Sequence, residues 1–171
     1  MDFFAIKASV MAFVVALIVS SCSKEEYVPL NATSKTCAIE IECVGESGEN
    51  LLADKSFADR VKVDGEASHS VIPFQIRNNR MCFDAEFPDQ SEMEWSEDKR
   101  EAVGVSRMTL RFGKHKASLK CYMRYIANRP PAAAGGRMIL ESLEYNGSVY
   151  RRNGGSVSIC LRFNRSGGLM Q

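Results

Sequence analysis

Strict alternation of apolar and polar side chains recurs along most of this chain, and no other feature limits its possible folds as strongly. In residues 37–43, the odd positions are apolar and two of the three even positions are acidic. Successive side chains of a β-strand point to opposite faces, so this pattern predicts a strand with one buried face. The same alternation indicates strands over 106–112, 117–126 and 156–163.

Turn-forming residues separate the alternating segments. The predicted hairpins join 70–77 to 80–87 through Asn78-Asn79, 106–112 to 117–126 through residues 113–116, and 138–145 to 148–151 through Asn146-Gly147. Asparagine and glycine tolerate the left-handed backbone that tight hairpin turns require. With a further short strand at 60–64, about eight strands and no convincing helix predict an all-β fold, an antiparallel β-sandwich. A closed β-barrel is the alternative.

The N-terminal residues predict the cellular location of the protein. The apolar run 10–19 is shorter than the roughly 20 residues needed to span a bilayer, but it suits the core of a signal peptide. It ends in Val19-Ser20-Ser21-Cys22, which resembles a bacterial lipobox, in which lipid is attached to the cysteine. The resemblance implies a lipoprotein signal peptide over 1–21 and a membrane anchor at Cys22. Its acyl chains, at about 0.8 kcal/mol per buried methylene, would make attachment effectively permanent.

The remaining chain is predicted to contain one domain. Residues 22–35 are polar, include Pro29 and lack periodicity, so we expect a flexible tether. The β-sandwich domain is expected over 36–163, followed by a frayed tail over 164–171. The 150 residues from Cys22 onward are enough for one ordinary domain with a sizeable core.

Two further similarities concern the mature chain. Cys22-Ser23-Lys24-Glu25-Glu26 is similar to the export signals of surface lipoproteins in Bacteroidota-type bacteria, where acidic residues follow the lipidated cysteine. Through Gly48-Glu49-Asn50-Leu51-Leu52 and Tyr145-Asn146-Gly147, the domain also resembles small uncharacterised lipoproteins of such bacteria. The resemblance implies a β-sandwich at the cell outer membrane, lipid-anchored and surface-exposed. It brings no catalytic residues.

Five cysteines remain besides Cys22. Alternation places Cys37, Cys43 and Cys121 on inward faces, where thiols pack as small apolar groups. Cys82 and Cys160 point outward and can form a disulfide only if their strands are neighbours, with Cα atoms within about 7 Å.

Catalytic and metal-binding patterns are missing from the sequence. His69 and His115 are the only histidines, and no zinc-ligand spacing, phosphate loop or nucleophile motif occurs. We therefore predict no catalytic residue, metal site or cofactor. One enzymatic alternative remains, a small glycan hydrolase using carboxylates of the 88–104 loop, where Glu92, Glu94, Glu97 and Asp98 surround Trp95. A solvated acidic loop explains the same residues.

Charge is distributed unevenly along the sequence. Residues 22–101 carry 18 acidic and 9 basic side chains, whereas 102–171 carry 2 acidic and 12 basic ones. Alternation places five of the later residues on one outward strip: Arg107, Arg111, Lys120, Tyr122 and Arg124. Such a strip suits an anionic glycan or a lipid head group, and a surface lipoprotein rarely meets nucleic acid.

The sequence therefore favours a binding or accessory module. In the alternative interpretation, the cations of the strip pair with acidic residues of neighbouring strands, namely Glu40, Glu42, Asp84 and Glu86. A purely structural envelope lipoprotein is the remaining class.

Overall fold

The computed structural model describes residues 30–128 and 135–170. Its strands are β1 (Ala32–Thr36), β2 (Ala38–Val44), β3 (Val61–Gly65), β4 (Gln75–Arg77), β5 (Arg80–Asp84), β6 (Glu94–Trp95), β7 (Glu101–Phe112), β8 (His115–Ala127), β9 (Gly136–Tyr145), β10 (Ser148–Arg151) and β11 (Ser156–Arg162). The short helical segments are η1 (Leu51–Ala53), α2 (Lys55–Ala58) and η2 (Gln90–Glu92).

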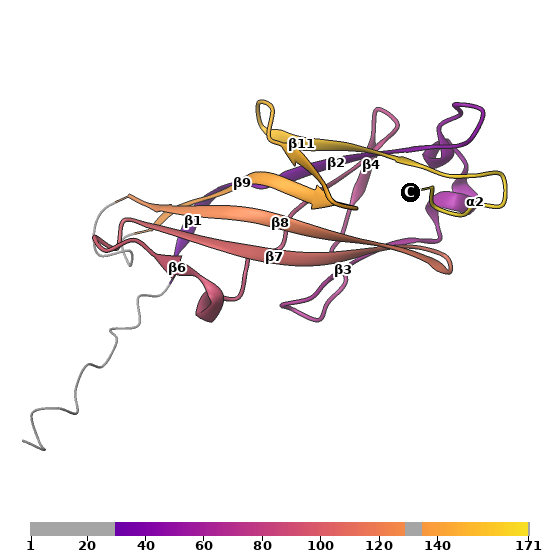
Figure 1. Ribbon diagram of the computed structural model, residues 1–171. Coiled ribbons are helices and arrows are strands. Elements are labelled where there is room, and N and C mark those ends of the chain that lie inside the picture. Colours follow the sequence, from indigo (N-terminus) through magenta and orange to yellow (C-terminus); the bar gives the residue numbers. More distant parts are fainter. Residues whose placement is uncertain (1–29, 129–134, 171) are drawn as a thin grey trace, which may run out of the picture.

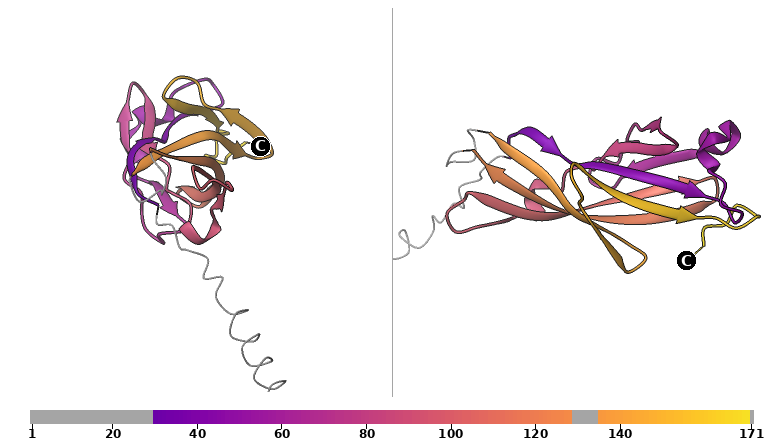
Figure 2. Two further views of the ribbon diagram at one scale, coloured as in Figure 1. Left: turned by 90° about the vertical axis from the view of Figure 1, so that its left-hand side faces the viewer. Right: turned by 90° about the horizontal axis from the view of Figure 1, so that it is seen from above.

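Two β-sheets form the fold and do not close into a barrel, so the prediction of an all-β sandwich is confirmed (Figure 1). The larger sheet has the order β1-β9-β8-β7-β3, with β10 also beside β9 and β6 also beside β7. The smaller sheet has the order β11-β2-β5-β4. The molecule is elongated along its strands (Figures 1 and 2).

The core lies between the sheets, on the faces that alternation assigns to it. In β2, Ile39, Ile41 and Cys43 are completely buried. In the long β7–β8 hairpin, Met108 and Leu110 are buried in the same way. Two of the predicted turns have the expected backbone, with positive φ at Asn78-Asn79 and at Asn146-Gly147. Local alternation and turn chemistry therefore fix both the strand faces and these hairpins.

Most strand pairs are antiparallel, as predicted, but each sheet also contains one parallel pair, which was not predicted. β1 runs parallel to β9, and β2 runs parallel to β11. A tight turn forces consecutive strands to be antiparallel, but it sets no direction for strands distant in sequence. Here the chain passes from β1 in one sheet to β2 in the other through Cys37, and both strands pair with C-terminal segments.

β7 begins earlier than predicted. The sequence predicts a loop at residues 101–104, because Gly104 resembles a turn residue, yet these residues pair with β8 and partly with β6. A Cβ atom on Gly104 would lie 2.3 Å from the Met93 sulfur and 3.1 Å from Cβ of Pro88. The glycine therefore allows the 88–93 segment to cross the strand closely.

Both ends of the described chain are more ordered than predicted. β1 occupies 32–36, so four of its five residues lie within the tether expected over 22–35, because β9 offers it a free edge. In the expected tail, Phe163 bridges to Leu169, and the Met170 amide donates to the Arg162 carbonyl at 2.7 Å. Cys22 and the expected signal peptide lie outside the described residues.

The five described cysteines are free thiols. β5 and β11 lie on opposite sides of β2, so Cys82 and Cys160 are separated by two strand spacings, about 10 Å. That separation exceeds the reach of a disulfide. Burial raises the pKa of Cys37 to about 11 and those of Cys43 and Cys121 to about 12.

Alkylation of the folded protein is therefore expected to modify Cys160 first and Cys82 next. The other three thiols are buried and mostly protonated at neutral pH, so they should react only after unfolding. Mass spectrometry of the alkylated protein, with a sample labelled in urea as the control, measures this order. Labelling of Cys43 as fast as Cys160 would show that the strand faces are wrongly assigned.

Candidate functional site

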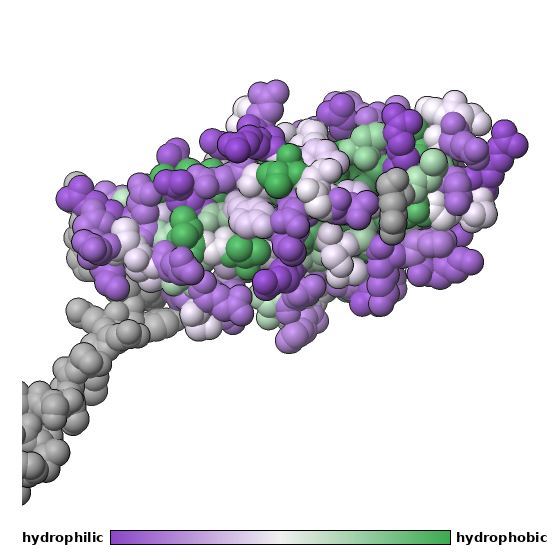
Figure 3. Space-filling model, in the orientation of Figure 1, coloured by the Kyte–Doolittle hydropathy of each residue, from purple (hydrophilic) through white to green (hydrophobic). Residues whose placement is uncertain are grey.

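All five residues of the predicted strip project from the exposed face of β7 and β8. Arg107 and Arg111 lie on β7, and Lys120, Tyr122 and Arg124 lie on β8. Cross-strand register places Arg107 directly opposite Lys120. The part of the surface seen in Figure 3 is largely hydrophilic, with apolar side chains in separate small patches.

Carboxylates of the same sheet already pair with most of this strip. Glu144 accepts hydrogen bonds from Lys120 at 3.1 Å and from the Tyr122 hydroxyl at 2.6 Å. Those two hydrogen bonds lower the pKa of Glu144, and the bond to Glu144 raises the pKa of Tyr122. Arg124 donates to Glu141 at 2.7 Å and to Glu101 at 3.0 Å. This end of the strip is therefore neutralised within the protein.

A β-bulge supplies one of these partners. The β8–β9 register shifts between Tyr122, which faces Ser142, and Met123, which faces Leu140. Glu141 is the extra residue, and it is exposed next to Arg124. Bulges characteristically redirect a side chain in this way.

The partners expected from the sequence are wrong. Glu40 forms an ion pair with Arg80, and Asp84 with Lys35, all away from the strip. Glu86 accepts hydrogen bonds from the backbone of residues 67 and 68. Glu40, Glu42 and Asp84 belong to the other sheet, because strand alternation shows which face a residue occupies but not which strand lies beside it.

A row of three cations remains at the other end of this face. Lys62 of β3 lies opposite Arg111 of β7, which lies opposite Lys116 of β8, and all three are exposed. We call these three residues the cationic row. Arg111 forms an ion pair with Asp64 at 2.5 Å. Within the described ranges, no carboxylate lies within 4.0 Å of the Lys62 or Lys116 ammonium group.

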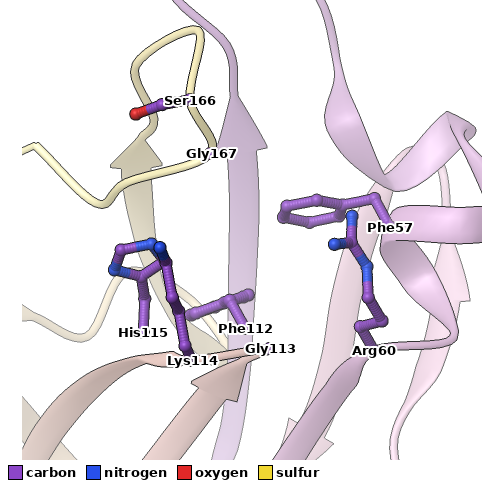
Figure 4. A pocket seen from close by; sticks show the side chains of 8 residues that line it. All are labelled: Phe57, Arg60, Phe112, Gly113, Lys114, His115, Ser166 and Gly167. Atoms are coloured by element: carbon purple, nitrogen blue, oxygen red, sulfur yellow. The ribbon is translucent and has the colours of Figure 1, made fainter.

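A cavity of about 300 Å³ adjoins the cationic row at the tip of the sandwich. We call it the tip pocket, and its lining consists of Phe57, Arg60, Phe112, Gly113, Lys114, His115, Ser166 and Gly167. In Figure 4, Phe57 and Arg60 lie on one side and the Ser166–Gly167 loop on the other, with Lys114 and His115 rising from the β7–β8 turn toward that loop. None of the lining residues is acidic.

Local structure fixes the walls of the tip pocket. The Asp54 side chain accepts a hydrogen bond from the Ser56 amide and caps α2, which presents Phe57. The Phe57 ring lies 5.3 Å from Phe163 and 6.0 Å from Phe112, between centroids. The β7–β8 turn has only two residues, with φ +61° at Gly113, rather than the four predicted. His115 therefore opens β8.

Two carboxylates of the acidic loop face one hollow. Asp89 and Glu92 line a hollow of about 270 Å³ with His69 and Arg107. Hydrogen bonds from Ser91 lower the pKa of Asp89, so this carboxyl lacks the raised pKa that a general acid needs.

The tryptophan of that loop is also turned away from the loop carboxylates. The Trp95 ring packs edge-on against Tyr125, with centroids 5.8 Å apart, and is half-buried against the core. Among the described residues, no group of three or more His, Cys, Asp or Glu side chains could hold a metal ion.

Lys62, Arg60 and Phe57 are not among the site residues predicted from the sequence. Lys62 alternates with Val61 and Val63, which marks its outward orientation, but nothing local shows that β3 pairs with β7. Phe57 and Arg60 occupy a short helical turn without an alternating pattern.

Comparison with protein-family models, curated proteins and solved structures finds no match to this chain. Within the described residues, no helix has the length and apolar character needed to cross a membrane.

Proposed function

We propose that this protein is an exported lipoprotein, held at the outer membrane through Cys22 and facing outward, that binds anionic glycans at the tip of its sandwich. The cationic row is the observation that carries this proposal. Like charges directly opposite one another on neighbouring strands are unfavourable, and the single carboxylate of Asp64 offsets one of three. Carboxylates or sulfates of a glycan would complete the neutralisation.

The position of the row favours a glycan over the lipids of the anchoring membrane. β1 begins at the end of the sandwich where β7 also starts, with two strands between them in the sheet, and the row lies near the other end (Figure 1). The 12 residues of β7 span roughly 40 Å between these ends. Cys22 precedes Leu30 by 8 residues, a reach of at most about 28 Å. An anchor at Cys22 would therefore leave the row directed away from its own membrane.

Neutralising the row is expected to weaken glycan binding. The variant Lys62→Gln/Lys116→Gln removes two exposed charges, each worth under about 1 kcal/mol, so affinity for polygalacturonate should fall about tenfold. Equilibrium titration of the full-length protein in a neutral detergent measures this change. Binding by the wild-type protein should weaken with added salt, and neutral dextran should not bind.

The variant Arg137→Gln/Arg151→Gln is the matched control. It removes the same charge from exposed positions on β9 and β10, away from the tip. Its affinity should remain close to that of the wild-type protein. Equal losses in the two variants, or salt-independent binding, would contradict the proposal.

A further inference from the structure

We propose that the tip pocket receives the terminal residue of such a glycan, a pyranose that carries a carboxylate, while the cationic row holds the units that follow. This inference rests on the proposed function and adds the ligand class of the pocket. Four properties of the site support it: its charge, its volume, its aromatic wall and its connection to the row.

Charge restricts the ligand to anions. Arg60, Lys114 and His115 contribute cationic or hydrogen-bonding groups to a lining that contains no carboxylate. The Arg60 Nε donates to the Ser56 carbonyl at 2.9 Å, which orients the guanidinium group beside the pocket and leaves its terminal nitrogens for a ligand. A guanidinium group binds a planar carboxylate in a forked geometry.

Volume and shape favour a single sugar ring. The cavity of about 300 Å³ is at the lower limit of small-molecule sites. The loop that bounds one side is held by two hydrogen bonds to Asn164, from the Gly167 and Gly168 amides at 2.8 and 2.7 Å. A fixed wall of this kind suits the end of a glycan better than a chain passing through.

The aromatic wall distinguishes a sugar from a bare anion. Phe57 is half-buried, and its contacts with Phe112 and Phe163 hold the ring in place. A fixed aromatic ring offers apolar surface to the C–H groups of a pyranose at low entropic cost. A sulfate or phosphate ion would gain nothing from it.

Short segments of the chain connect the pocket to the row. Lys62 follows Arg60 by two residues, and Lys116 follows Lys114 by two. The segments 60–62 and 114–116 both lie at the same end of the larger sheet, where β3 and β8 flank β7. If the terminal sugar of a glycan occupies the pocket, the acidic sugars that follow it would therefore contact the cationic row.

The test compares galacturonate monosaccharide with polygalacturonate. Wild-type protein should bind the monosaccharide, and its methyl ester should bind at least about tenfold more weakly because the charge is lost. The pocket variant Lys114→Gln/His115→Gln should no longer bind the monosaccharide. The row variant Lys62→Gln/Lys116→Gln should still bind it. If the double pocket variant fails to fold, Lys114→Gln alone, at an exposed turn position, replaces it.

The two proposals can fail separately. If polygalacturonate binds and depends on the row, but pocket variants match the wild-type protein for both ligands, the pocket inference is wrong and the proposed function stands. Displacement of the monosaccharide by equimolar sulfate would also overturn the inference, because a simple anion site would explain it. If polygalacturonate fails to bind, the proposed function is wrong, and the pocket inference that rests on it is wrong too.

Discussion

Replacing Phe163 with alanine is expected to lower the free energy of unfolding by about 3–5 kcal/mol. Phe163 is completely buried, and its ring lies 5.0 Å from Phe112 and 5.3 Å from Phe57, between centroids. These three rings pack at the tip end of the core, and two of them, Phe57 and Phe112, also line the tip pocket. Truncation would remove the buried ring and leave a cavity between the two sheets, which the rigid strands cannot close fully.

Urea unfolding, monitored through the fluorescence of Trp95, measures this loss of unfolding free energy. Phe87→Ala is the matched control, since Phe87 is 36% exposed and its truncation should cost about 1 kcal/mol or less. For a domain of this size, the Phe163 variant should also melt roughly 10 °C lower. A loss below about 1 kcal/mol for Phe163→Ala would mean that the aromatic cluster is not packed as described.

The Cys22→Ala variant is expected to leave the membrane fraction or to accumulate as an unprocessed precursor. Without the thiol, no acyl chain can be attached, and no second anchor is predicted from the sequence. Fractionation of cells together with intact-mass measurement detects both outcomes. Cys160→Ala removes an exposed cysteine instead and should remain membrane-bound with its lipid mass.

An unchanged mass and an unchanged membrane fraction in Cys22→Ala would refute lipidation at this residue. Outward display is tested separately by treating intact cells with protease. Removal of the domain is expected, and complete protection would place it on the periplasmic side.

Local sequence signals predicted the strands and their faces because both depend on neighbouring residues. The alternation of Ile39 and Ile41 with Glu40 and Glu42 gives the inward and outward sides of β2 without any knowledge of its partners. Asn146-Gly147 defines a hairpin for the same reason, since its turn geometry is local.

Pairing between distant segments was not predictable in this way. The parallel pairs β1–β9 and β2–β11 join residues more than 100 positions apart, and alternation is identical for parallel and antiparallel neighbours. The same limitation made the predicted acidic partners of the strip wrong, because Asp64 and Glu144 reach the strip only through β3 and β9. Glu141 required a bulge as well, which shifts the register by one residue.

The candidate site is therefore partly predicted. Alternation identified Arg111 as an outward cation. The strand register places it between Lys62 and Lys116, several residues along the strands from Lys120 and Arg124. The tip pocket depends on loops that meet only in the folded chain, so its lining residues carry no joint signal in the sequence.

Lysine footprinting tests most directly whether anionic glycans bind at the tip. Lys62, Lys114 and Lys116 are exposed there, and Lys35 and Lys99 are exposed elsewhere, so every folded molecule contains its own controls. Amine acetylation of the full-length protein, with and without polygalacturonate, is read out by mass spectrometry. Polygalacturonate is expected to protect Lys62, Lys114 and Lys116 from acetylation and to leave the labelling of Lys35 and Lys99 unchanged. Protection spread evenly over all five lysines, or confined to the two controls, would contradict it.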